Sequence, residues 1–162
     1  MHIEKIEIID IQKIKSELEG LDCSAQFCLQ GLHKDQDPKE LVSHDENFNY
    51  VWDSKYNGKV TANNCIYPLF DLPYINSMIN QLNLGYTKLM VLIPRRCYTY
   101  HTDKSPRIHI PIITNENNFF IIEDTIYRLP ADGTVYKVDT TKMHSFVNAS
   151  NKTRLHIVGI QR

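Results

Sequence analysis

The chain has 162 residues, of which 42% are hydrophobic and 23% charged, and its formal net charge is −1, as is ordinary for one soluble globular domain. The balanced charge leaves no basic excess for a nucleic-acid footprint, and no apolar run reaches the ~18 residues of a transmembrane helix. The N-terminus lacks an apolar signal segment, so we expect a cytoplasmic protein without nucleic-acid or membrane partners. Four cysteines without CxxC spacing disfavour a zinc knuckle or a redox motif.

The sequence pattern of residues 1–86 predicts helices and loops that cover one side of the fold. The stretch DIQKIKSELEGL has its apolar residues on one helical face, with Asp10 as the N-cap. The stretch DLPYINSMINQLNLG predicts a second helix, with Asp71 as the N-cap and Gly85 at its end. Between the two helices, residues 25–31 predict a short strand and residues 33–49 a long polar loop.

From residue 87 the chain predicts strands, because short apolar or alternating runs recur between turn residues. About eight such strands in two facing sheets make a jelly roll, the arrangement also found in cupins. We therefore predict a single domain over 1–162, α+β and mainly β in class. Residues 1–86 would form the helical covering region and residues 87–162 a double-stranded β-helix. The eight predicted strands are KLMVLI, YTYH, RIHIPIIT, FFII, TIYRL, TVYKV, HSFVN and RLHIVGI.

Two His-x-Asp motifs are candidates for metal binding. One, at 33–35, lies in the polar loop, whereas His101 and Asp103 follow strand-forming residues. Side chains two residues apart on an extended segment point to the same side, so His101 and Asp103 could converge on one ion. The motif is common by chance, and either pair could equally be surface residues.

A third ligand could come from His144, which begins a later predicted strand. Two imidazoles and one carboxylate leave coordination positions open, as in non-haem Fe(II) oxygenases. The competing interpretation is that His144 is a hydrogen-bonded core histidine, which is the commoner role for a lone inward-facing His.

Arg154 begins the last predicted strand, where an inward-facing guanidinium would be costly without an anionic partner. A planar guanidinium matches a carboxylate with two parallel hydrogen bonds, so a dicarboxylate bound between Arg154 and a metal would explain this position. The competing interpretation is that Arg154 lies at a solvated strand edge.

The stretch RIHIPI repeats the same Arg-x-His pattern. Arg107 and His109 share one face of the predicted strand, and Ile108, Ile110 and Ile112 share the other. Periodicity leaves open which face lines the interior, because either could be covered.

On these residues the chain resembles the 2-oxoglutarate/Fe(II)-dependent oxygenases, and within them the aspartyl/asparaginyl β-hydroxylase-like group, which includes enzymes that hydroxylate free proline. The resemblance covers roughly residues 70–162. One departure is Arg95, since many relatives have Pro-Gly where this chain has Pro-Arg. The stretches that carry the resemblance are LMVLIPRRCYTYHTD, RIHIPIIT, MHSFVNAS and TRLHIVGI.

The resemblance implies a dioxygenase that uses Fe(II), 2-oxoglutarate and O2 to hydroxylate an amino-acid side chain, releasing succinate and CO2, with ascorbate as a supporting reductant. The substrate would be a free amino acid or a protein-bound residue. The implied iron ligands are His101, Asp103 and His144. Arg154 would hold the distal carboxylate of 2-oxoglutarate. Arg107 and His109 would reach the cosubstrate or a substrate carboxylate.

Two other functions fit the same pattern. A cupin-like metal enzyme that does not use 2-oxoglutarate would share the barrel and the histidine ligands but would not need Arg154. A non-catalytic β-barrel binding module would keep the fold and bind no metal. Succinate release separates the first from the predicted dioxygenase, and a metal titration separates the second.

Overall fold

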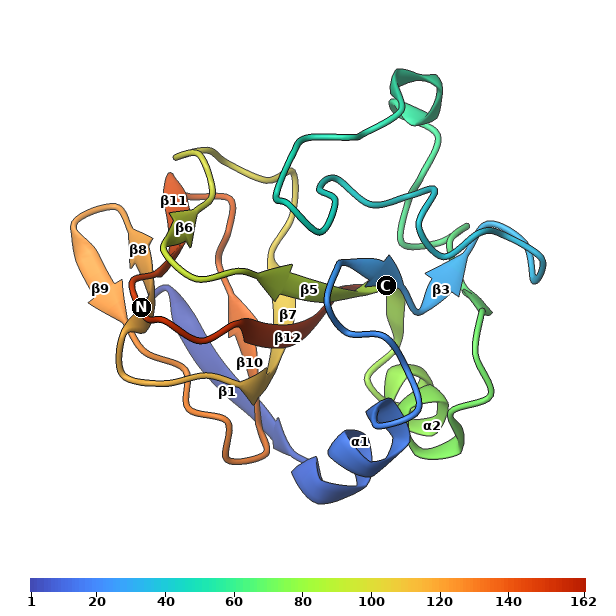
Figure 1. Ribbon diagram of the computed structural model, residues 1–162, viewed down its shortest axis with the longest axis horizontal. Coiled ribbons are helices and arrows are strands. Elements are labelled where there is room, and N and C mark those ends of the chain that lie inside the picture. The colour runs from blue at the N-terminus through green and yellow to red at the C-terminus, as the bar shows by residue number, and fades with distance from the viewer.

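The computed structural model describes residues 1–162 and has two antiparallel sheets with two helices beside the larger one (Figure 1). The larger sheet has six strands in the order β1-β10-β7-β12-β5-β2. The central strands β7, β12 and β5 carry most of the residues discussed below. The bounds of the six strands are β1 Ile3–Ile8, β2 Phe27–Cys28, β5 Leu84–Leu92, β7 Arg107–Ile113, β10 Thr134–Val138 and β12 Arg154–Gln161.

The smaller sheet has four strands in the order β6-β11-β8-β9. Together the two sheets form the predicted jelly-roll architecture. A two-stranded ribbon, β3-β4, and a 3-10 helix, η1, lie in the covering region. The bounds of these elements are β6 Arg96–Cys97, β8 Asn118–Ile122, β9 Thr125–Tyr127, β11 His144–Asn148, β3 Gln30–Gly31, β4 Tyr67–Pro68 and η1 Ser54–Tyr56.

The central strands of the large sheet separate an apolar face from a polar one. On β7, Ile108, Ile110 and Ile112 are fully buried and belong to the main hydrophobic cluster, which also contains residues of both helices. Because side chains alternate along a strand, Arg107 and His109 face the other way, toward the smaller sheet. This settles the orientation that periodicity left open: the Arg-x-His face lines the interior.

Two helices, α1 (Ile11–Leu18) and α2 (Pro73–Gln81), cover the apolar face and lie side by side (Figure 1). The predicted Asp10 cap is confirmed, since its carboxylate accepts from the backbone N–H groups of Gln12 and Lys13. The predicted Asp71 cap is wrong, because Leu72 occupies the N-cap position of α2 without a side-chain hydrogen bond. No helix of the chain has the length and apolarity that crossing a bilayer would require.

The start of α2 is instead capped by α1. The Glu17 carboxylate accepts hydrogen bonds from the backbone N–H groups of Tyr74 (2.6 Å) and Ile75 (2.9 Å). A carboxylate at a helix N-terminus satisfies unpaired N–H groups and interacts favourably with the helix dipole. The predicted end at Gly85 is also wrong, because α2 ends at Gln81 and Gly85 lies in β5.

The predicted strands of the second half are confirmed except for YTYH. The regular strand β6, Arg96–Cys97, ends before this segment, and within the segment His101 forms an isolated bridge with His144. Between these points the Ser145 hydroxyl donates to the Tyr98 carbonyl, so a side chain replaces part of the regular ladder. The large sheet also includes β1 and β2 from the first 86 residues, which the sequence assigned to the covering region.

Arg95 adopts the left-handed backbone conformation, with φ of 58°. Glycine reaches this conformation without a steric penalty, which gives a reason for the Pro-Gly that is common at this turn in relatives.

Replacing Glu17 with Ala should lower the free energy of unfolding by roughly 1 kcal/mol, because two N–H groups at the start of α2 lose their acceptor. Glu19→Ala is the matched control, since Glu19 is an exposed residue of the same helix end with no such contact. Urea denaturation of the two variants measures the difference. Equal losses would show that the Glu17 bonds contribute nothing specific.

Candidate active site

A cavity of about 530 Å³ lies between the two sheets, and the loop that carries His44 and Tyr50 contributes to its lining. Inward-facing residues of the large sheet form one wall, and residues of β11 and of the segment after β6 form the other. All six residues that the sequence singled out for metal or cosubstrate binding line this one cavity: His101, Asp103, Arg107, His109, His144 and Arg154.

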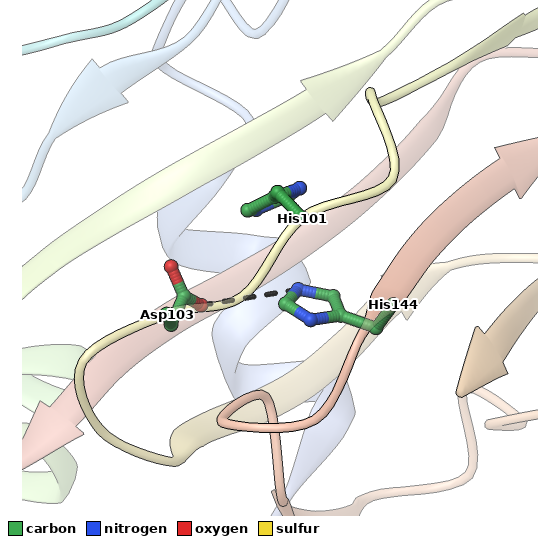
Figure 2. A group of neighbouring side chains, drawn as sticks. All are labelled: His101, Asp103 and His144. Carbon is green, nitrogen blue, oxygen red and sulfur yellow. Dashed lines mark ion pairs between the residues drawn. The ribbon is translucent and has the colours of Figure 1, made fainter. Parts of the chain in front are cut away.

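The predicted metal ligands come together at one point of the cavity wall. One possible ligand atom from each of His101, Asp103 and His144 lies within 4.8 Å of the others (Figure 2). The Asp103 carboxylate lies 3.9 Å from Nε2 of His144. The backbones are joined as well, because His101 and His144 exchange N–H···O=C hydrogen bonds of 3.0 and 2.8 Å.

Backbone carbonyls fix the orientation of both imidazoles. Nδ1 of His101 lies 2.6 Å from the Thr99 carbonyl, and Nδ1 of His144 lies 2.9 Å from the Lys142 carbonyl. A carbonyl can only accept, so both Nδ1 atoms carry the proton and both Nε2 atoms keep a free lone pair. Burial lowers the pKa of His144, which favours the neutral form that binds metals.

Asp103 is held from two sides. Its backbone N–H donates to the Thr140 carbonyl at 2.8 Å, and its carboxylate forms an ion pair with Arg107 at 3.2 Å. Nη1 of Arg107 also donates to the Ser105 hydroxyl. Arg107 therefore contacts a candidate ligand directly and can orient its carboxylate.

Arg154 is a fully buried cation without an anionic partner. Its side chain is 1% exposed, and no carboxylate lies within ion-pair distance. Its guanidinium stacks on the Phe146 ring at 3.6 Å, and Nη2 donates to Nδ1 of His156 at 2.9 Å. Nε has no partner at all. A buried guanidinium with unused donors is costly unless an anion from outside the chain completes it.

His156 contacts this guanidinium and His109 lies against His156, both as neutral rings. Burial, with the nearby charge of Arg154, lowers the pKa of both well below the ordinary value. Since Nδ1 of His156 accepts from Arg154, the His156 proton lies on Nε2. Nδ1 of His109 lies 3.4 Å from Nδ1 of His156, whose single lone pair already accepts from Arg154, so this contact does not fix the tautomer of His109.

The donor set fits a divalent metal of the iron type. Two neutral imidazoles and one carboxylate are the ligands that leave open positions in non-haem iron sites. Backbone carbonyls that accept from the second nitrogen of each imidazole are also typical of metal-binding histidines. The other His-x-Asp motif, His33 and Asp35, lies in an exposed loop and does not line the cavity.

Two basic residues of the cavity were missed by the sequence reasoning, Lys88 on β5 and His44 in the covering loop. Lys88 alternates with the buried residues Leu89 and Thr87, which is the signal that could have placed it on the inner face. His44 stacks on Phe48 at 4.4 Å in an irregular loop, where no periodicity exists to find it.

Comparison with protein families matches residues 10–159 to the family described as aspartyl/asparaginyl beta-hydroxylase. The match begins sixty residues earlier than the resemblance seen in the sequence motifs, so it includes α1 and the covering loops. A comparison with curated proteins found no match.

Solved structures similar to the chain are cupin proteins of low identity. A Cupin 2 conserved barrel domain protein from Salinispora arenicola is 14% identical, with a TM-score of 0.39 over 47% of this chain and 61% of that one. The chain thus covers less than two thirds of that protein. A predicted oxalate decarboxylase from Thermotoga maritima is 20% identical, with a TM-score of 0.40 over 52% and 70%. A Cupin 2 domain of an XRE family transcriptional regulator from Enterobacter cloacae is 18% identical, with a TM-score of 0.38 over 51% and 85%.

Replacing His101 or Asp103 with Ala should abolish the binding of one equivalent of Mn(II), measured by calorimetry, because two donors are too few to hold the ion against water. The circular dichroism spectrum should stay unchanged, since neither residue belongs to a hydrophobic cluster.

The matched controls are His33→Ala and Asp35→Ala, which remove the same chemical groups from the other His-x-Asp motif. They should bind Mn(II) as the wild type does. Loss of binding in the controls and not in the cavity variants would mean that the other motif is the metal site.

Proposed function

The chain belongs to the aspartyl/asparaginyl beta-hydroxylase family, and we propose that it is an Fe(II)- and 2-oxoglutarate-dependent dioxygenase that hydroxylates an amino-acid side chain, either of a free amino acid or of a protein residue. The proposal goes beyond the hydroxylase class that the family match supports, since it names the metal, the cosubstrate and the reaction. Its localisation is proposed to be cytoplasmic.

The observation that carries the proposal is Arg154. A buried guanidinium without a carboxylate partner lines the same cavity as the His101, Asp103 and His144 cluster. A diacid that binds the metal at one end and Arg154 at the other would satisfy both groups at once. Guanidinium and carboxylate form parallel charge-assisted hydrogen bonds, which are among the strongest in proteins.

In this proposal His101, Asp103 and His144 hold Fe(II), and Arg154 holds the distal carboxylate of 2-oxoglutarate. When bound, Fe(II) and 2-oxoglutarate activate O2 for hydroxylation of a substrate C–H bond, with release of succinate and CO2. The chain supplies position and charge. The Thr99 and Lys142 carbonyls keep both imidazoles aimed at the ion, and Arg107 orients the Asp103 carboxylate.

The cavity also supplies an environment that excludes bulk water from the cosubstrate. Phe146 covers one face of the Arg154 guanidinium, and Phe120 packs edge-on against His109 at 4.9 Å. Apolar rings around the charged groups lower the local dielectric, which strengthens the attraction between a guanidinium and a bound carboxylate. His109 lines the same cavity as a neutral ring, so it can form a hydrogen bond with a group bound beside the metal.

The alternative of a cupin-like metal enzyme without 2-oxoglutarate gives no role to the unpaired Arg154. The alternative of a non-catalytic binding module gives no role to the ordered donor set. Stoichiometric succinate release in the presence of Fe(II), ascorbate and 2-oxoglutarate would support the dioxygenase. Mass spectrometry of a panel of amino acids and peptides in the same reaction would identify the substrate.

Replacing Arg154 with Leu should weaken 2-oxoglutarate binding to the Mn(II)-loaded protein at least tenfold, because each hydrogen bond to a charged group contributes roughly 1.5–3 kcal/mol. Mn(II) affinity should change little, since Arg154 contacts none of the three ligands. Calorimetry measures both constants.

The control is Arg95→Leu, which removes an exposed guanidinium outside the cavity. Arg154→Lys, which keeps the charge, covers the case in which the Leu variant folds poorly. Unchanged 2-oxoglutarate affinity in both Arg154 variants would remove this residue from the cosubstrate site.

A further inference from the structure

Lys88 lies on the inner face of the large sheet and lines the cavity that also holds the candidate ligands His101, Asp103 and His144. In the sheet register it stands beside Val158 of β12, and Val158 stands beside His109 of β7. Its side chain lines the cavity, and its charge interacts with those of Asp103 and Arg107. The proposed roles of the other cavity residues do not use this lysine.

The Lys88 ammonium has no partner of its own. It makes no hydrogen bond and no ion pair, and its closest described interaction is with the face of the Tyr86 ring at 4.3 Å. The nearby thiols of Cys28 and Cys65 are not anionic partners, because burial raises the pKa of each to about 12. Burial lowers the pKa of Lys88 itself, the expected effect on a cation without a counter-charge.

The charges of the cavity do not balance even with the proposed metal and cosubstrate bound. Lys88, Arg107 and Arg154 line the cavity together with a single carboxylate, Asp103. A divalent metal and a dianionic cosubstrate cancel one another and leave this excess of positive charge unchanged. Arg107 already shares Asp103, so Lys88 is the cation that remains without an anion.

Lys88 lies away from Arg154, the residue proposed to hold the distal carboxylate of the cosubstrate. Lys88 pairs with Val158 in the sheet. Val158 lies four residues along β12 from Arg154, which corresponds to roughly 13 Å of strand. Arg107 lies on β7, on the other side of β12, next to Asp103. A diacid that extends from Arg154 to the metal would have both of its carboxylates bound by these two partners, so Lys88 would remain free.

We propose that Lys88 binds a carboxylate of the primary substrate and so holds the substrate beside the metal. The assignment rests on the proposed function, because it treats Arg154 as the cosubstrate residue. The carboxylate could be the α-carboxylate of a free amino acid or the side-chain carboxylate of an aspartyl residue in a peptide. Both present the same group to Lys88, and the test below distinguishes them.

The test measures the binding of matched probes to protein loaded with Mn(II) and 2-oxoglutarate, by calorimetry and without turnover. One arm compares the twenty free L-amino acids with their amides. The other compares N-acetyl-aspartate methylamide with N-acetyl-asparagine methylamide. The wild type should bind the carboxylate member of at least one pair about tenfold or more tightly, as expected for one hydrogen-bonded ion pair.

Lys88→Met should reduce that preference to less than twofold, and Lys88→Arg should retain most of it. Lys5→Met is the matched control, since Lys5 is an exposed lysine on β1 outside the cavity. The affinity for 2-oxoglutarate should change less than twofold in Lys88→Met, unlike in Arg154→Leu. The arm that shows the preference identifies the source of the carboxylate.

Three results would overturn the assignment: no carboxylate probe binds the wild type, the preference survives in Lys88→Met, or Lys88→Met loses 2-oxoglutarate as Arg154→Leu does. Failure of 2-oxoglutarate to bind the Mn(II)-loaded wild type is seen before any probe is added. That result would overturn the proposed function and this assignment with it.

Discussion

The two helices bury the outer face of the large sheet, and this coverage allows its inner face to carry charge. On β7 and β12 the residues that pack against α1 and α2 are isoleucines and leucines, whereas the alternate residues are Arg107, His109, Arg154 and His156. A sheet with one side in water would bury its apolar face toward the other sheet. On these two strands the isoleucines and leucines pack outward against the helices, which leaves their inner face to polar side chains, beside a smaller apolar cluster between the sheets that contains Phe120 and Phe146.

Three cations line the cavity between the sheets together with a single carboxylate, and this excess of positive charge favours anionic ligands. Low dielectric and incomplete pairing raise the energy of each cation, and a ligand that brings carboxylates removes part of this cost on binding. The same arrangement explains why the histidines remain neutral. Burial and the charge of Arg154 both disfavour a proton on His109 and His156, so these rings act as hydrogen-bonding groups rather than as further charges.

Sequence reasoning found the elements whose signals are local. Asp10 was correctly predicted as a cap because its acceptor geometry involves only residues two and three positions ahead. The strands of the second half followed from alternation and turn residues.

The cap of α2 could not be predicted, because Glu17 reaches it from another helix. The YTYH segment has strand composition, yet its pairing depends on Ser145, far along the chain. At the site, the spacing of His101, Asp103 and His144 identified them as candidate ligands. Lys88 belongs to no motif, and its proposed role depends on the absence of an anionic partner, which only the structure reveals.

The reciprocal backbone bonds between His101 and His144 make the donor cluster independent of the ion that it could hold. In small zinc domains the ligands meet only when metal is present, and the ion supplies the energy that orders the chain. In this fold the backbone hydrogen bonds between His101 and His144, with the sheets around them, offset the conformational entropy lost when the ligands are ordered. The backbone would therefore hold the two histidines in position whether or not an ion is bound.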